Sequence, residues 1–454
     1  MTPGTVPGTP RVLRAMNDRA ALDLLLEHGP LSRTRIGTLT GLSKPTASQL
    51  LARLEAAGLV IATGTSEGRP GPNAQLYAVN PATAHVAALD VAPDRILAEV
   101  ADITGRTAGA YELGTAGRRA DGAVRHVVDA LDGAVKAAGL TRADLHRVVI
   151  GTPGAFDPGT GRLRYASHLP GWHSPTLLDD LAAALPMPLE YDNDVNLAAV
   201  AEHRLGAARG HDDFVLLWNE AGIGAAIVIG GRLHRGWTGG AGEVGFLPVP
   251  GTPLVRQVGK ADSGGFQELA GARAVRVIAR DLGLPVPEGP DREVAAHLLA
   301  RAANDVARSG EHPEPAAGST AVADGTARAD WAHVAAGGNG AAGTHGAAGP
   351  YGADDQARLS AGAQRDLLRH VATGLATGLA SMVAVLDPGL LVLSGGVIAA
   401  GGEPLRALVQ AELAELAVPR PGLVLGTVRE RPVLQGALES ALATTRDEVF
   451  DTSR

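Results

Sequence analysis

The stretch Tyr191-Asp192-Asn193-Asp194-Val195-Asn196 joins a short apolar run, 187–191, to an Ala-rich run, 197–205. The first run is typical of a strand and the second of a helix, so four short polar side chains stand at a strand-to-helix junction. Proteins with alternating strands and helices bind ligands at such junctions. An Asn beside an Asp can hydrogen-bond neighbouring hydroxyl groups, and the carboxylate can also accept a proton. The alternative is that Asp192, Asn193 or Asp194 only caps the helix.

Composition limits the classes of protein to which the chain can belong. A chain of 454 residues is too long for one core, so two or three domains are expected. Cysteine is absent from the sequence, which excludes disulfides, thiolate metal sites and a cysteine nucleophile. No apolar run approaches the roughly 20 residues that span a bilayer, and the Pro- and Gly-rich start lacks the core of a signal peptide. The sequence therefore predicts a cytoplasmic protein without a membrane partner.

Charge divides the chain into a basic head and an acidic body. Residues 1–80 contain eight Lys and Arg against five Asp and Glu, whereas the whole chain has a net charge of −8. This asymmetry indicates a nucleic-acid partner at the head alone.

The head has the pattern of a helix-turn-helix. After a flexible tail, 1–10, we expect a helix from 11 to Gly29, a short helix between Ser32 and Gly41, and a third helix over 44–57 capped by Ser43. The third helix has one apolar stripe, made of Ala47, Leu50, Leu51 and Leu54. Its other side has small polar residues that could face DNA.

A β-hairpin of 59–62 and 74–79 follows and is expected to form a wing, which completes a domain over 11–80. Its tip, Gly68-Arg69-Pro70-Gly71, puts one Arg on a narrow loop that suits a minor groove. The predicted DNA contacts are Lys44, Pro45, Thr46, Ser48, Gln49 and Arg53 on the third helix, and Arg69 on the wing. Gln49 best suits an adenine edge, whereas Arg53 is placed to reach phosphate at most. The alternative is a three-helix module that binds protein.

From residue 82 strands alternate with helices, which is typical of an α/β body. Strands are expected over 85–91, 95–102, 147–151, 214–218, 225–230 and 390–393, and helices over 120–139, 267–282, 291–307 and 356–386, with two more near the C-terminus. The region 308–355 is different, because it is almost entirely Ala, Gly, Ser, Thr, Pro and scattered charge. It has too little apolar surface to offset its chain entropy, so a disordered insertion is predicted.

Several motifs resemble the ROK family of repressors and sugar kinases. The most specific is Gly222-Ile223-Gly224 through Gly230-Gly231-Arg232-Leu233 to Gly239-Gly240-Ala241-Gly242-Glu243-Val244-Gly245, which is similar to the family's signature. The segment 166–172 and the pair Asn193-Asp194 also match, and the head resembles the repressor branch. The resemblance covers nearly the whole chain outside the insertion. It implies an α/β fold with a winged helix-turn-helix followed, over 82–450, by an actin-like (ribonuclease H-like) ROK body. This body would have lobes of about 82–190 and 191–430, with the C-terminal helix returning to the first lobe.

Two loops depart from the family's kinase pattern. Where its kinases carry Asp-x-Gly-Gly-Thr, a turn that cradles ATP phosphates, this chain has Asp90-Val91-Ala92-Pro93-Asp94. Pro93 lacks an N–H donor, and Asp94 adds negative charge. In the second loop Glu220-Ala221 replace Gly-Thr, which removes a hydroxyl and adds a carboxylate. Acidic groups that face a polyphosphate oppose its binding, so we expect no ATP, no cofactor and no catalysis, with Asp194 at a vestigial base position.

The resemblance also bears on metal and sugar binding. The family's structural zinc uses a His and three Cys, whose positions fall here on Phe246, Gly259, Ala261 and Phe266. We therefore expect no metal, and we expect the two Phe rings to pack together. The resemblance assigns hydroxyl binding to five residues, with His168 where the family often has Asn: His168, Asn193, Asp194, Glu243 and Glu268. A sugar or polyol is the expected ligand; the alternative is that these residues only line the body.

The sequence thus predicts a DNA-binding transcriptional regulator, a repressor of carbohydrate-metabolism genes. Its expected partners are double-stranded operator DNA, a sugar or sugar-phosphate effector, and further copies of itself in a homodimer or homotetramer. Two alternatives stay open. One is a sugar kinase that retains a DNA-binding head, and the other is a regulator whose body binds a protein partner instead of a sugar.

Overall fold

The structure, a computed structural model, describes residues 10–452 apart from 66–73, 116–121, 158–162, 165–168, 170–171, 173, 175, 251, 257–263 and 310–352. The chain forms two compact units. Unit 1 comprises Met1–Ala201 and Arg431–Arg454, and unit 2 comprises Glu202–Glu430. Residues 1–9, most of the predicted insertion, the wing tip with Arg69 and the segment with His168 lie outside the described residues.

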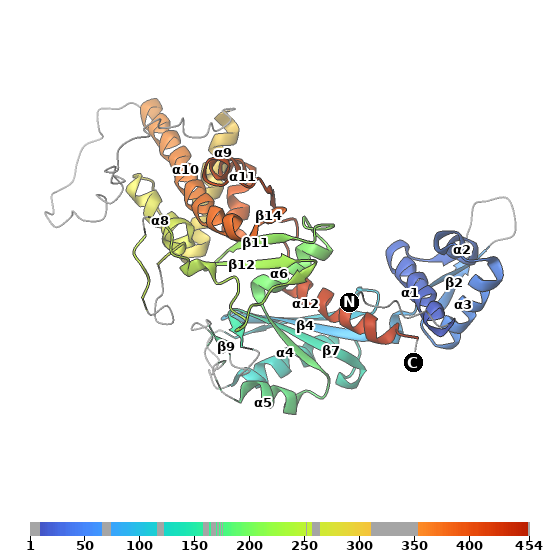
Figure 1. The fold of residues 1–454 in the computed structure, drawn as a ribbon. Helices are drawn as coiled ribbons and strands as arrows, with labels where there is room; N and C mark the ends of the chain where they lie inside the picture. Colours follow the sequence, from blue (N-terminus) through green and yellow to red (C-terminus); the bar gives the residue numbers. More distant parts are fainter. Residues whose placement is uncertain are drawn as a thin grey trace, which may run out of the picture. The chain divides into compact units, whose positions relative to one another are not determined.

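The head of unit 1 is a winged helix (Figure 1). Its elements are α1 (Pro10–His28), β1 (Leu31–Ser32), α2 (Arg33–Thr40), α3 (Lys44–Ala56), β2 (Val60–Thr65) and β3 (Gln75–Val79), and its strands pair in the order β1-β3-β2. The predicted caps are present, because the Ser32 side chain accepts a hydrogen bond from the Arg35 N–H and the Ser43 side chain accepts one from the Thr46 N–H. The whole predicted stripe of α3 is buried in the core of the head.

The rest of unit 1 is a five-stranded sheet that is covered on both faces. Its elements are β4 (His85–Val91), β5 (Arg95–Asp102), β6 (Thr107–Gly114), α4 (Ala123–Ala137), β7 (Leu145–Thr152), α5 (Leu177–Ala184), β10 (Leu189–Asn193), α6 (Asp194–Arg204) and α12 (Pro432–Val449); β8 (Ala155–Phe156) and β9 (Leu163–Arg164) form a separate pair. Alternate residues of β4 face opposite sides. Ala87 and Leu89 belong to one apolar cluster with α4 and α5, whereas Val86 and Ala88 belong to another with α12. Figure 1 shows α4 and α5 on one side of this sheet and α12 on the other.

Unit 2 contains a second five-stranded sheet with long helices. Its elements are β11 (Phe214–Asn219), β12 (Ile223–Ile229), β13 (Arg232–Leu233), the one-turn helix η4 (Val244–Phe246), α7 (Gln267–Ala270), α8 (Ala272–Asp281), α9 (Asp291–Ser309), α10 (Ala353–Leu386), β14 (Leu390–Ser394), α11 (Gly396–Leu416) and β15 (Gly422–Leu425).

Both large sheets have the same strand order. In unit 1 the antiparallel β4, β5 and β6 are joined by the parallel β7 and β10, in the order β10-β7-β4-β5-β6. In unit 2 the antiparallel β11, β12 and β13 are joined by the parallel β14 and β15, in the order β13-β12-β11-β14-β15. Two sheets of the same strand order agree with the actin-like body that the resemblance implied, and the predicted fold class is confirmed.

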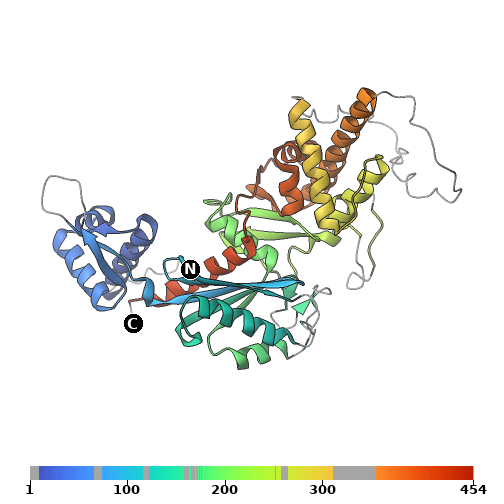
Figure 2. The ribbon, with the colours of Figure 1, turned by 180° about the vertical axis from the view of Figure 1, so that it is seen from behind.

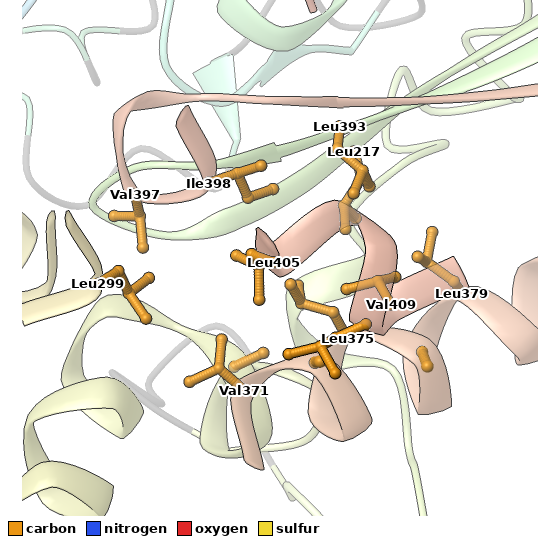
Figure 3. Close-up of a cluster of buried hydrophobic side chains, with 14 of the residues drawn as sticks. Leu217, Leu299, Val371, Leu375, Leu379, Leu393, Val397, Ile398, Leu405 and Val409 are labelled. Carbon is orange, nitrogen blue, oxygen red and sulfur yellow. The ribbon is translucent and has the colours of Figure 1, made fainter. Parts of the chain in front are cut away.

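The largest apolar core lies in unit 2. Figure 3 shows Leu375 and Leu379 of α10 among side chains from other elements, including Leu405 of α11 and Leu393 of β14. Over Ala361–Leu386, α10 is long and apolar enough to cross a bilayer, but 56% of its most apolar window is buried inside the protein. These are the properties of a core helix in a folded domain.

The structure differs from the expected secondary structure at several places, including the ends of the predicted insertion, where α9 continues to Ser309 and α10 begins at Ala353. The pattern did not predict β6, because this edge strand is mostly exposed and lacks an apolar alternation. The strand β10 runs through Asn193, so Asp192 and Asn193 end the strand instead of following it. The helix predicted over 267–282 is divided at Gly271, whose backbone is extended with ψ 164°.

Candidate functional site

The outward face of α3 is the first candidate site. Most of its predicted contacts are exposed and Ser48 is half-buried; the exposed ones are Lys44, Pro45, Thr46, Gln49 and Arg53. The hydroxyls of Thr46 and Ser48 make hydrogen bonds within the helix and its cap. Thr46 Oγ1 lies 2.8 Å from Ser43 Oγ, and Ser48 Oγ donates to the Lys44 carbonyl at 2.9 Å. Long side chains at Lys44 and Gln49, next to a helix N-terminus that favours phosphate, suit a major groove.

Arg53 has a partner inside the head that the sequence did not indicate. Its Nη2 donates to Asp18 Oδ1 of α1 at 2.6 Å, and the Asp18 side chain is almost completely buried. The guanidinium is therefore fixed at the far end of α3 from Lys44. Any contact that Arg53 makes with phosphate has to use the part of the group that stays exposed.

The stretch around Asn193 is the second candidate site, and its side chains cap α6. Asn193 Oδ1 accepts the N–H groups of Val195 at 2.8 Å and Asn196 at 3.2 Å, and its Nδ2 donates to the Gly154 carbonyl at 3.0 Å. The capping interpretation of this stretch is thus realised by Asn193. Among the residues that the structure describes, Asn193 uses one of its two amide hydrogens, which leaves the other for a ligand.

The neighbouring acids support this junction. Asp192 Oδ1 accepts hydrogen bonds from the Asn193 N–H at 2.8 Å and from Asn196 Nδ2 at 2.9 Å. Asp194 Oδ1 accepts the Val195 N–H at 2.9 Å, at the first residue of α6. In both residues the carboxylate accepts hydrogen bonds at this junction.

Glu243 and Glu268 belong to unit 2, where their segments lie side by side. The Phe266 N–H donates to the Leu247 carbonyl at 3.0 Å, which joins the end of η4 to the start of α7. Glu243 directly precedes η4 and is partly buried, and this burial raises its pKa to about 6. Glu268, in contrast, is exposed in the first turn of α7. A buried carboxyl that is easily protonated can both donate to and accept from a hydroxyl ligand.

Replacing Glu243 by Gln should stabilise the protein above pH 6. The folded state holds the Glu243 proton more tightly than the unfolded state, whose pKa is near 4.5. Below about pH 4.5 the neutral Glu243 carboxyl makes its full contribution to the free energy of unfolding, which is about 2 kcal/mol. This contribution is lost as the pH rises through about 6. Glu243→Gln should therefore match the wild type at pH 4 and exceed it at pH 7.5 in chemical denaturation. Glu268→Gln is the exposed control, and an equal gain there would contradict this explanation.

The first of the two unusual loops is a tight turn with few donors. The Ala92 N–H donates to the Arg95 carbonyl at 2.9 Å, and Pro93 has no N–H. The carbonyl of Asp94 accepts the Thr115 N–H at 2.8 Å. Burial raises the pKa of Asp90 to about 6, with Asp94 adding to the shift and Arg95 opposing it. The departure from the kinase motif singled out this turn, but no sequence pattern indicated that the pKa of Asp90 would be raised.

The second loop puts a carboxylate at a helix N-terminus. Glu220 Oε1 accepts the Gly396 N–H of α11 at 2.6 Å, and Arg292 Nε lies 3.9 Å from its Oε2. Gly395 has φ 93°, and a Cβ there would lie 2.4 Å from the Asn219 carbonyl oxygen, so β11 and α11 approach closely. Glu220 therefore occupies the anion-binding end of α11 from within the same unit.

The predicted zinc positions are filled in part by an apolar side chain. Phe266 is fully buried, and a Cβ on Gly378 of α10 would lie 2.3 Å from its Cζ. Phe266 thus packs against α10, and Phe246 is only half-buried. Positions 259 and 261 lie outside the described residues, and within the described ones no cluster of His, Asp and Glu could hold a metal.

Family comparisons agree with this architecture. Residues 88–275 match the ROK family, and residues 16–69 match the MarR family. The chain carries a ROK-family domain behind a MarR-type winged helix.

Relatives of this chain include both regulators and kinases. The xylose repressor of Caldicellulosiruptor bescii is 28% identical over 243 residues, which are 53% of this chain and 61% of that protein. The glucokinase of Thermotoga maritima is 32% identical over 173 residues, or 36% of this chain and 52% of that protein. The match therefore spans about six-tenths of the repressor and about half of the glucokinase.

A solved structure resembles this chain over nearly its whole length. This is a ROK family transcriptional regulator described as a homologue of the E. coli MLC protein. It has a TM-score of 0.60 at 18% identity, and the match covers 95% of this chain and 96% of that chain. The likeness confirms the fold with its winged-helix head.

Proposed function

We propose that this ROK chain is a DNA-binding transcriptional regulator, a repressor of carbohydrate-metabolism genes, whose body binds a sugar or sugar derivative and does not phosphorylate it. The observation that carries the proposal is the combination of an exposed α3 face with a Glu220 carboxylate bound at the α11 N-terminus. The first feature suits operator DNA, and the second competes with the phosphates of a nucleotide.

The head supports the DNA-binding part of the proposal. In helix-turn-helix proteins the second helix of the motif enters the major groove with its N-terminal residues on base edges. Lys44 and Gln49 are exposed at this part of α3, while Leu50, Leu51 and Leu54 hold its other face in the core. The relative named as a xylose repressor supports the same conclusion. A dimer or tetramer would read a roughly palindromic operator.

Two local features argue against a phosphoryl donor. At the first loop one backbone N–H is used in the turn and the next residue, Pro93, has none. At the second loop Glu220 takes the Gly396 N–H that an anion would need. A nucleotide phosphate would have to displace a carboxylate from this N–H and tolerate its charge nearby. Asn193 and Asp194 would then serve to recognise a sugar as hydrogen-bonding groups of a sensor.

The proposal is tested by selecting duplex DNA from a random library with the full chain, followed by thermal shift with free and phosphorylated sugars. Recovery of a two-fold symmetric sequence, together with stabilisation by one class of sugar that is lost in Asp194→Ala, is the expected result. Failure to enrich any sequence would exclude the operator-binding function. Enrichment without sugar stabilisation would leave a regulator with another kind of effector.

A sugar kinase with a DNA-binding head is the second candidate, because the Thermotoga maritima relative is named a glucokinase. We expect no turnover when the protein is mixed with Mg-ATP and a panel of hexoses and pentoses. The coupled ADP assay should stay at the level of the buffer for both the wild type and Asp194→Asn. Sugar-dependent ADP release that disappears in Asp194→Asn would replace the sensor assignment with the kinase.

A further inference from the structure

The C-terminal helix of unit 1 ends inside the core of the head. Phe450 follows α12, is 1% exposed, and belongs to the same apolar cluster as Leu22 of α1 and Leu54 of α3. Ile103, from the turn between β5 and β6, completes the cluster, and its carbonyl accepts a hydrogen bond from Arg446 Nε at 3.0 Å. Both views of the fold show the end of α12 beside the head (Figures 1 and 2). The head thus shares its core with α12.

Polar groups join the same three helices. Asp18 Oδ1 accepts Arg53 Nη2 at 2.6 Å, while Asp18 Oδ2 accepts the Thr452 hydroxyl at 3.1 Å. Beside it, Arg19 Nη1 donates to Asp447 Oδ1 of α12 at 2.7 Å, and its guanidinium carbon lies 5.8 Å from the Phe450 ring centroid. Asp18 is 3% exposed, and a buried carboxylate has to be paired. One oxygen of Asp18 therefore serves the recognition helix and the other serves the chain after α12.

The other half of α12 packs against the helix of the candidate ligand site. A Cβ on Gly436 would lie 1.8 Å from the Leu197 carbonyl oxygen, so the backbones of α12 and α6 are in direct contact. The buried Arg147 adds a second connection, because it binds Glu448 of α12 at 2.6 Å and also Glu190 of β10. Both β10 and α6 contribute to the junction at Asn193.

The two helices α6 and α12 also lie where the chain passes between the two units. The polypeptide passes between the units at Ala201–Glu202, within α6, and at Glu430–Arg431, directly before α12. One crossing lies within α6 and the other lies directly before α12. These are the same two helices whose backbones are in contact at Gly436. Arg431 has a φ of 48°, so the entry into α12 is a sharp turn and not a helical continuation.

We propose that Asp18 is a positioning residue for operator recognition. Through one carboxylate oxygen it holds Arg53 of α3, and through the other it binds Thr452, so that the position of α12 affects the position of Arg53. The inference rests on the proposed function, because it explains how a ligand at α6 acts on the head. Packed interiors transmit displacement instead of absorbing it. A shift of α6 against Gly436 moves α12, and Phe450 and Thr452 pass this movement to Asp18 and α3.

The test uses the full chain with Asp447→Ala and Thr452→Val combined. This double variant removes the two polar links to Arg19 and Asp18 and leaves the Arg53–Asp18 pair and Phe450 in place. The matched control combines Asp23→Ala, which removes the carboxylate that Arg19 binds within α1, with Thr444→Val on α12, whose hydroxyl donates to the Ser440 carbonyl. Thr452→Ser keeps the hydroxyl and serves as the rescue.

Two measurements are made on each protein. Hydrogen exchange without DNA should be faster in α1 and α3 of the double variant than in the wild type, with equal unfolding temperatures. Affinity for the selected operator should fall about tenfold, and affinity for random DNA should fall less, because a displaced α3 loses its base contacts as well as any phosphate contact of Arg53. Addition of operator should slow exchange at 192–197 in the wild type and not in the double variant, because coupling between sites is reciprocal. The control and Thr452→Ser should behave as the wild type.

Wild-type exchange in α1 and α3 of the double variant would overturn the proposal, as would an equal change in the control. The exchange comparison without DNA does not depend on operator binding. If the wild type selects no DNA, the proposed function fails, and faster exchange in α3 of the double variant still supports Asp18 as the link to α12.

Discussion

Replacing Gln49 by Ala should weaken binding to the selected operator roughly tenfold to a hundredfold, as expected for the loss of one bidentate base contact. Gln49 lies on the exposed face of α3, between the buried residues Ala47 and Leu50. Its amide can pair with the two hydrogen-bonding groups of an adenine in the major groove. The variant should also accept all four bases at one position of the operator, which fluorescence anisotropy against single-base variants would detect.

Two further substitutions make this result specific. Lys44→Ala should weaken binding to all sequences alike and reduce the salt slope by about one, as for a phosphate contact. Glu55→Ala, exposed near the end of the same helix, removes a negative charge and should not weaken binding. Similar losses in all three variants would mean that α3 does not read bases.

Replacing Gly436 by Ala should destabilise unit 1 more than any single surface change. The new Cβ would lie 1.8 Å from the Leu197 carbonyl oxygen and 2.5 Å from the carbonyl carbon, and neither atom belongs to a flexible side chain. The helices α6 and α12 would have to separate, and such overpacking typically costs about 1–3 kcal/mol or more. We expect a lower midpoint in chemical denaturation, together with weaker operator binding, because α12 also supports the head.

Gly362→Ala is the matched control for this prediction. Gly362 lies in α10, and a Cβ there would meet nothing within 4 Å. A helical Gly without neighbours is replaced by Ala with a gain of up to about 1 kcal/mol. Opposite signs for the two substitutions would support the close crossing at Gly436. A Gly436→Ala protein as stable as the wild type would contradict it.

The local structure of the head could be predicted from the sequence alone. Ser32, Gly41 and Ser43 set the ends of α2 and α3, and the predicted apolar stripe of α3 is the buried one. The strands β4 and β5 also begin and end at the predicted residues. These features depend on caps and on periodicity, in which each signal comes from residues within about one helical turn or a few strand positions.

Only the tertiary structure decided how the polar side chains are used. The Asn193–Asp194 stretch could be predicted as a ligand site or as a cap, and the structure uses Asn193 as the cap of α6 and ties it to Gly154. Arg53 was expected at DNA and is also paired with Asp18, and Glu220 reaches Gly396, far away in the sequence. A carboxylate, amide or guanidinium accepts many partners, so its partner is determined by which segments the fold brings within about 3 Å of it.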